Sequence, residues 1–92
     1  MAGALYSTDP AADLRFVELD GLTALFHLPS GMTHVVAPPA PQILEALADG
    51  PADAAAILAR IKVRYDVAED GAENAILARL SELEAAGLVR RA

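Results

Sequence analysis

The chain has 92 residues, which is the size of one small domain and leaves no room for a cofactor domain beside a substrate domain. Apolar residues make up 54% of it, aromatic residues only 4%, and cysteine is absent, which excludes a disulfide framework and a thiolate metal site. The formal net charge of −6 disfavours binding to nucleic-acid phosphates and to anionic membranes. The core is therefore expected to consist of Leu, Ile and Val on short elements.

Nothing in the sequence predicts a membrane segment. No apolar run reaches the ~18 residues that a spanning helix requires. The first residues lack the basic start and the apolar stretch of a signal peptide, so we expect a cytoplasmic protein.

Residues 1–13 are small and mixed in polarity, and we expect them to form a flexible N-terminal tail. Residues 14–92 are expected to form a single domain. Its first part, 14–37, predicts a three-stranded antiparallel meander. Asp20-Gly21 separates the first two apolar runs and favours a tight hairpin turn, because both central residues of a type I′ turn need positive φ.

The second turn of the meander falls at Pro29-Ser30-Gly31. A two-residue turn at Ser30-Gly31 would place His27 opposite His34 and Phe26 opposite Val35. A three-residue loop would shift this register by one residue.

Pro38, Pro39 and Pro41 end the third strand, because proline lacks the N–H donor that a sheet needs. Apolar spacing then predicts helices over 41–50, over 54–67 with Asp53 as N-cap, and over 72–87 with Gly87 at the C-terminal end. A break is expected at 68–71. The predicted fold is thus α+β, a three-stranded antiparallel meander followed by three helices (βββααα), similar to a winged helix-turn-helix.

The sequence contains no convincing pattern of catalytic or metal-binding residues. The serines stand in no nucleophile-elbow or phosphate-loop context, and Ser30 fits a turn. His27 and His34 could share one face of the sheet, but no third ligand stands at suitable spacing in the strands. We therefore expect no enzyme activity, no cofactor and no bound metal.

A winged-helix transcription regulator is the alternative function. Arg60 and Arg64 would supply phosphate contacts. The last helix, which would read DNA, carries three glutamates against one arginine, and this charge disfavours binding to DNA.

The third strand suggests peptide binding instead. As an edge strand without Lys or Glu to guard it, 32–37 could accept an extended peptide through main-chain hydrogen bonds. Ala78, Ser81 and Ala85 lie on one face of the last helix, where small side chains would allow close approach. A homodimer that pairs its third strands across a two-fold axis is a further possibility.

These segments resemble PqqD-like proteins, small peptide chaperones also called RiPP recognition elements. The resemblance lies in Ala40, Ile43, Leu44, Leu47 and Gly50, in Ile57 with Ile61, and in Leu80, Leu83, Gly87 and Leu88. "SGMTHVV" further resembles the branch encoded beside HPr-kinase-related proteins. The chain departs from the family pattern at the elbow, where Ala37-Pro38-Pro39 replaces the usual Asn or Asp helix cap.

The resemblance implies that the protein binds the leader segment of a precursor peptide and presents it to a modifying enzyme, such as a radical SAM protein. It implies that the leader adds as a strand along Thr33, His34, Val35 and Val36. Ala78, Ser81 and Ala85 are then the candidate floor of the peptide groove.

Overall fold

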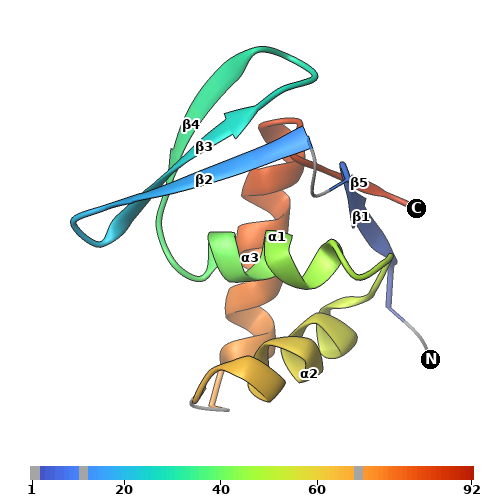
Figure 1. Cartoon of the computed structure of the whole chain (residues 1–92). Helices are drawn as coiled ribbons and strands as arrows, with labels where there is room; N and C mark the ends of the chain where they lie inside the picture. The colour runs from blue at the N-terminus through green and yellow to red at the C-terminus, as the bar shows by residue number, and fades with distance from the viewer. Residues whose placement is uncertain (1–2, 11–12, 68–69) are drawn as a thin grey trace.

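The computed structural model describes residues 3–10, 13–67 and 70–92. It shows an α+β fold in which a twisted meander lies against three helices, and the β2–β3 turn extends beyond the helices (Figure 1). The elements in chain order are β1 (Tyr6–Thr8), β2 (Leu14–Leu19), β3 (Leu22–His27), β4 (Met32–Val36), α1 (Ala40–Leu47), α2 (Ala54–Arg64), α3 (Ala72–Ala85) and β5 (Val89–Arg91).

The meander confirms the predicted antiparallel order β2-β3-β4. Its first turn is the predicted one: Leu19 pairs with Leu22, and Asp20 and Gly21 have φ values of 44° and 85°. Positive φ at both central residues is the requirement of a type I′ hairpin, which follows the twist of the sheet.

The predicted register of the second hairpin is wrong. His27 pairs with Met32 and Leu25 with His34, so the loop comprises residues 28–31 and neither shorter turn forms. Within this loop the Gly31 N–H donates to the His27 carbonyl oxygen at 2.9 Å, and Gly31 has a φ of 70°. The two histidines still share a sheet face, because a diagonal offset of two residues preserves the alternation of side chains.

α2 and α3 begin where predicted, α1 begins one residue earlier, and all three helices end before the predicted residue. The Asp53 carboxylate accepts a hydrogen bond from the Ala56 N–H at 2.8 Å, which confirms it as the N-cap of α2. Pro39 precedes α1 without a side-chain cap, as the missing Asn or Asp suggested. Of the break expected at 68–71, residues 68–69 lie outside the described residues.

The C-terminal end of α3 closes in the predicted way. Gly87 has a φ of 80°, the Leu88 N–H donates to the Leu83 carbonyl, and the Gly87 N–H donates to the Glu84 carbonyl. These two bonds form the Schellman motif, and Leu88 turns back into the core.

A second sheet, not predicted from the sequence, joins the two ends of the chain. β1 pairs antiparallel with β5, with Tyr6 opposite Arg91 and Thr8 opposite Val89, so the order is ββββαααβ rather than βββααα. The segment predicted as a tail therefore contains a strand, and Tyr6 and Val89 are buried. Strands of three residues are too short to show a periodic pattern, and their pairing joins the two ends of the chain.

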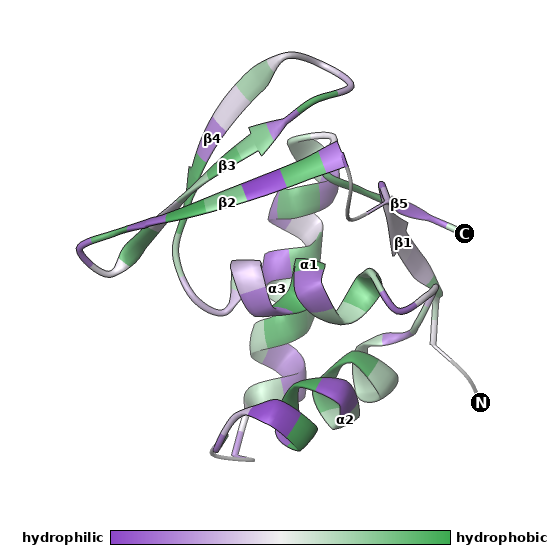
Figure 2. Cartoon of the chain, viewed as in Figure 1, coloured by the Kyte–Doolittle hydropathy of each residue, from purple (hydrophilic) through white to green (hydrophobic). Residues whose placement is uncertain are grey.

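The core lies between the inner face of the meander and the helices. Hydrophobic and polar residues are interspersed along β2 and along all three helices (Figure 2). The helices and β3 supply most of the buried apolar side chains, whereas β2 contributes only Leu14. The large side chains that are fully buried are Leu25, Ile43, Leu44, Ile57, Leu80 and Leu88. No helix among the described residues combines the length and the apolar character needed to cross a membrane.

Candidate functional site

β4 is an edge strand of the meander. It pairs with β3 on one side, and none of the described strands pairs with its other side. Thr33 and Val35 are exposed on the outer face of the sheet, whereas His34 and Val36 are half-buried on the inner face. An open edge of this kind leaves alternate main-chain N–H and C=O groups available to an extended peptide.

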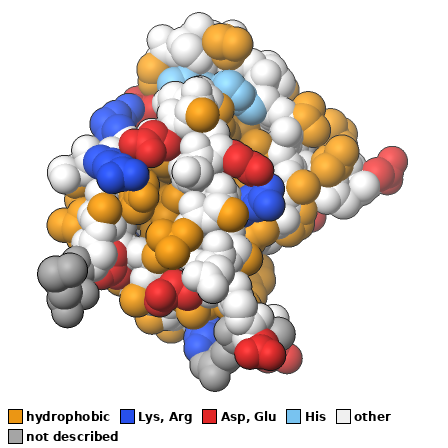
Figure 3. Space-filling model, turned by 180° about the vertical axis from the view of Figure 1, so that it is seen from behind, with side chains coloured by type: hydrophobic (Ala, Val, Ile, Leu, Met, Phe, Trp, Pro, Cys, Tyr) orange, Lys and Arg blue, Asp and Glu red, His pale blue; other side chains and the backbone are white. Residues whose placement is uncertain are grey.

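A groove of about 300 Å³ runs between β4 and α3. His34, Val35 and Val36 form the strand wall, and the helix wall is formed by Arg79, Glu82, Leu83 and Ala86. Figure 3 views the molecule from behind, the side on which α3 lies, with the histidine side chains near the top and acidic and basic groups intermixed below them. The groove therefore has an apolar floor and a rim of both charges.

The Arg79 guanidinium and the Glu82 carboxylate form an ion pair across one turn of α3. Both side chains are substantially exposed, so the pair adds little stability and can open to accommodate a ligand.

The structure separates the predicted site residues into two groups. His34, Val35 and Val36 line the groove, and Thr33 lies on the same strand with its side chain on the outer face. Ala78, Ser81 and Ala85 do form one face of α3, but that face is exposed and lies outside the groove lining.

Three of the four residues that form the helix wall, Arg79, Glu82 and Ala86, each follow one of the predicted residues by one position, and the fourth is Leu83. One residue corresponds to about 100° of rotation around a helix. The predicted residues and the residues of the groove lining therefore lie on adjacent faces of the same helix.

A polar cluster behind the strand edge was not predicted. The His27 Nε2 lies 2.5 Å from Asp9 Oδ2, and its Nδ1 lies 2.7 Å from the Ser30 hydroxyl. Arg90 donates to the other oxygen of Asp9 at 2.8 Å. The hydrogen bond from His27 and then that from Arg90 hold the pKa of the Asp9 carboxyl below its ordinary value.

This cluster connects the segment after β1, the end of β3, the β3–β4 loop and β5. The Ser30 hydroxyl also accepts the Met32 N–H at 3.2 Å, so its position fixes the start of β4. The residues of a Ser-His-Asp combination are thus engaged in holding a turn. Asp9 stands far from His27 in the sequence, and no local pattern links them.

His27 and His34 lie close together with ring centroids 6.4 Å apart in an edge-to-face arrangement. The described residues contain no group of three His, Cys, Asp or Glu side chains placed to hold a metal ion.

The basic residues of α2 make contacts within the protein. Arg60 donates to the carbonyl oxygens of Ala46 and Gly50, which lie at and beyond the end of α1. Arg64 pairs with Glu45, and the hydrogen bond to that carboxylate raises the pKa of Arg64. Binding DNA would have to compete with these contacts.

Comparison with known proteins identifies the family to which this chain belongs. Neither the curated proteins nor the solved structures gave a match. The family model described as Coenzyme PQQ synthesis protein D (PqqD) matches residues 23–89, which span β3 after its first residue, β4, all three helices and the first residue of β5. The resemblance inferred from the sequence is thereby confirmed, and the chain belongs to the PqqD family.

Proposed function

We propose that this protein is a non-catalytic chaperone that binds the leader segment of a precursor peptide by strand addition to β4. The open edge of β4 carries this proposal, since it offers main-chain hydrogen bonds beside a groove of about 300 Å³. Membership of the PqqD family supports a role as an accessory protein that binds a peptide.

In this proposal the client forms a fourth strand of the meander. Side chains on its inner face enter the groove between His34 and Leu83, and Arg79 and Glu82 flank them. A modifying enzyme, such as a radical SAM protein, then acts on the presented part of the peptide. The meander with its three helices is a winged-helix-like scaffold in this reading, and "SGMTHVV" suggests the branch associated with HPr-kinase-related proteins.

The direct test is titration of isotope-labelled protein with leader peptides from neighbouring genes, read from amide signals. The amide signals of residues 33–36 should shift at the lowest peptide concentrations. Synthetic peptides methylated at single backbone nitrogens should lose affinity at every second position, roughly tenfold where a ladder hydrogen bond is removed. Equal effects at successive positions, or unmoved signals at 33–36, would contradict strand addition.

A matched pair of protein variants gives a second test. Val35→Pro on β4 should abolish peptide binding, whereas Val17→Pro on the opposite edge strand, β2, should weaken folding without selective loss of binding. Circular dichroism first identifies the conditions in which both variants are folded. Equal loss of binding in the two folded variants would count against β4 as the site.

A homodimer through β4 would occupy the same edge. If it forms, light scattering should show that a saturating leader peptide converts the dimer to a monomer, because the peptide and the second copy compete for the same main-chain groups.

A further inference from the structure

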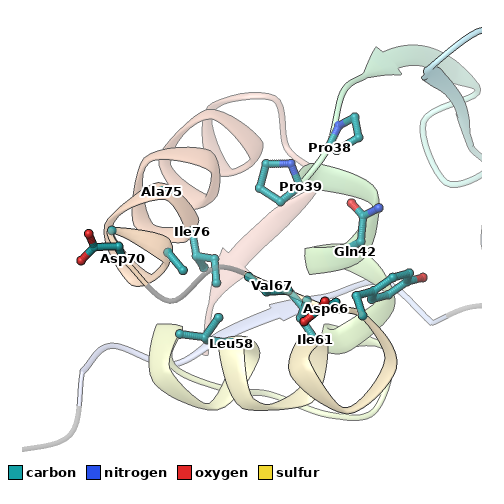
Figure 4. Close-up of a pocket in the computed structure, with 13 residues that line it drawn as sticks. Pro38, Pro39, Gln42, Leu58, Ile61, Asp66, Val67, Asp70, Ala75 and Ile76 are labelled. Atoms are coloured by element: carbon teal, nitrogen blue, oxygen red, sulfur yellow. The ribbon is translucent and has the colours of Figure 1, made fainter.

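A second cavity lies among the helix ends, apart from the β4 groove. It has a volume of about 460 Å³ and opens between Pro39 at the start of α1, Leu58 and Ile61 on α2, and Ala75 and Ile76 on α3 (Figure 4). Ligand pockets commonly have volumes of roughly 300–1,000 Å³. Its walls are mostly apolar, which suits an apolar group.

Gln42 gives this cavity a specific polar feature. The side chain belongs to the first turn of α1 and lines the cavity, with its amide oxygen turned toward Pro39 (Figure 4). That oxygen is buried and has no hydrogen-bond partner among the described residues. An unsatisfied buried acceptor destabilises a protein, so an occupant that donates a hydrogen bond here would recover this free energy.

The charged side chains that line the cavity are acidic. Asp66 and Asp70 lie on its rim, both exposed, and the carboxylate of Asp70 is turned outward at one end (Figure 4). A neighbouring hollow of about 390 Å³ shares Gln42 and Tyr65 with the cavity and adds Glu18 and Glu45. Among the described residues that line either hollow, every charged one is acidic. Glu45 already pairs with Arg64, so Asp66, Asp70 and Glu18 are the carboxylates that favour a basic partner.

We propose that this cavity binds an apolar side chain from a basic polypeptide segment of a partner protein. An N–H group of the segment donates to Gln42 Oε1, and flanking Lys or Arg side chains approach Asp66, Asp70 and Glu18. The cavity and the β4 groove have Pro38 in common but otherwise different walls, so a client on β4 and this partner can bind together. The site thus adds a second docking surface to the proposed function and does not depend on it.

Three short synthetic peptides test the proposal. The first has leucine flanked on both sides by two lysines, the second replaces lysine with glutamate, and the third replaces leucine with alanine. Only the first should shift the methyl signals of Ile61 and Ile76 and the side-chain amide signal of Gln42. The other two peptides should bind at least about tenfold more weakly. The glutamate peptide loses the charge attraction, and the alanine peptide loses the apolar contact.

Protein variants make the test specific to the cavity. Gln42→Leu should raise the thermal midpoint of the free protein, since it removes a buried unsatisfied oxygen, and yet weaken binding of the lysine-leucine peptide roughly fivefold or more. Ala75→Leu should block the opening. Ala59→Leu, the same change at an exposed position of α2, is the control and should bind normally.

Equal binding of the three peptides, or full affinity retained by both Gln42→Leu and Ala75→Leu, would overturn the proposal. The result is separable from the function proposed for β4. Folded Val35→Pro protein should lose the leader peptide and keep the lysine-leucine peptide, whereas Ala75→Leu should show the reverse.

Discussion

At the scale of single residues, a hydrogen-bonded cluster around His27 positions the start of the edge strand β4. His27 is a buried histidine with both ring nitrogens engaged, one by Asp9 and the other by Ser30. Its place in the sequence indicates only a strand residue before a turn. Because Ser30 also accepts the Met32 N–H, the cluster links the position of the N-terminal segment to the start of the proposed binding strand.

We predict that Asp9→Asn lowers the free energy of unfolding at neutral pH by about 1–2 kcal/mol, since the carboxylate accepts hydrogen bonds from charged or polarised donors. The folded pKa of Asp9 lies below its ordinary value of 3.8. The contribution of Asp9 to stability is therefore complete above the ordinary pKa. It is lost as the pH falls from the ordinary pKa through the lower pKa of the folded state.

Denaturant titrations of the wild type and Asp9→Asn at pH 7 and in acid measure this difference, which should shrink in acid. Asp20→Asn is the control, because asparagine also tolerates the positive φ of the type I′ turn. An equal loss of stability in the two variants, or a difference unchanged by pH, would refute the role given to Asp9.

At the scale of elements, short-range signals determine where the helices start. Asp53 has extended backbone geometry and accepts the Ala56 N–H, so it satisfies one of the free donors of α2. α1 has no such side chain, and its start depends on the fixed φ of proline and on burial of Ile43 and Leu44.

We predict that Asp53→Ala destabilises the protein by about 1 kcal/mol, whereas Asp53→Ser retains most of the stability because its hydroxyl can cap the same N–H. Thermal unfolding followed by circular dichroism at 222 nm checks the order of the three proteins. If alanine and serine are equally destabilising, the capping hydrogen bond contributes nothing.

At the scale of the whole molecule, the two ends of the chain hold the fold together. Tyr6 exchanges main-chain hydrogen bonds with Ala52 at 2.9 and 3.0 Å, pairs with Arg91 across the small sheet, and has a buried side chain. Its ring also lies beneath the Arg91 guanidinium, 5.7 Å from the ring centroid. The N-terminal segment is therefore a structural part of the domain.

We predict that Tyr6→Ala costs about 2–4 kcal/mol in unfolding free energy, as expected for the loss of a large buried side chain. Leu5→Ala, at a neighbouring position that is 47% exposed, should change the stability by less than about 0.5 kcal/mol. Urea unfolding gives both values, and similar small effects would show that the β1–β5 sheet contributes little.

The sequence by itself determined what short-range physics decides: the positive-φ turn at Asp20-Gly21, the Asp53 cap, the Gly87 terminus, the antiparallel meander and the apolar faces of the helices. It also carried the family pattern, because that pattern consists of core and cap positions close together in the chain. These features depend on a residue and its near neighbours, so a linear reading could find them.

Only the tertiary structure decided the features that join distant residues. The β3–β4 register depended on a loop held by His27 and Ser30, whose place was fixed in turn by Asp9 and Arg90. The pairing of β1 with β5 needed both ends of the chain. The face of α3 that meets β4 was set by the packing of Leu80 and Leu83 in the core, which turned Arg79 and Glu82 toward the groove and left Ala78 and Ser81 in solvent. A rotation of one residue about a helix axis leaves no trace in local composition. This is the physical reason that the sequence indicated α3 as a wall of the groove but not which face of α3 lines it.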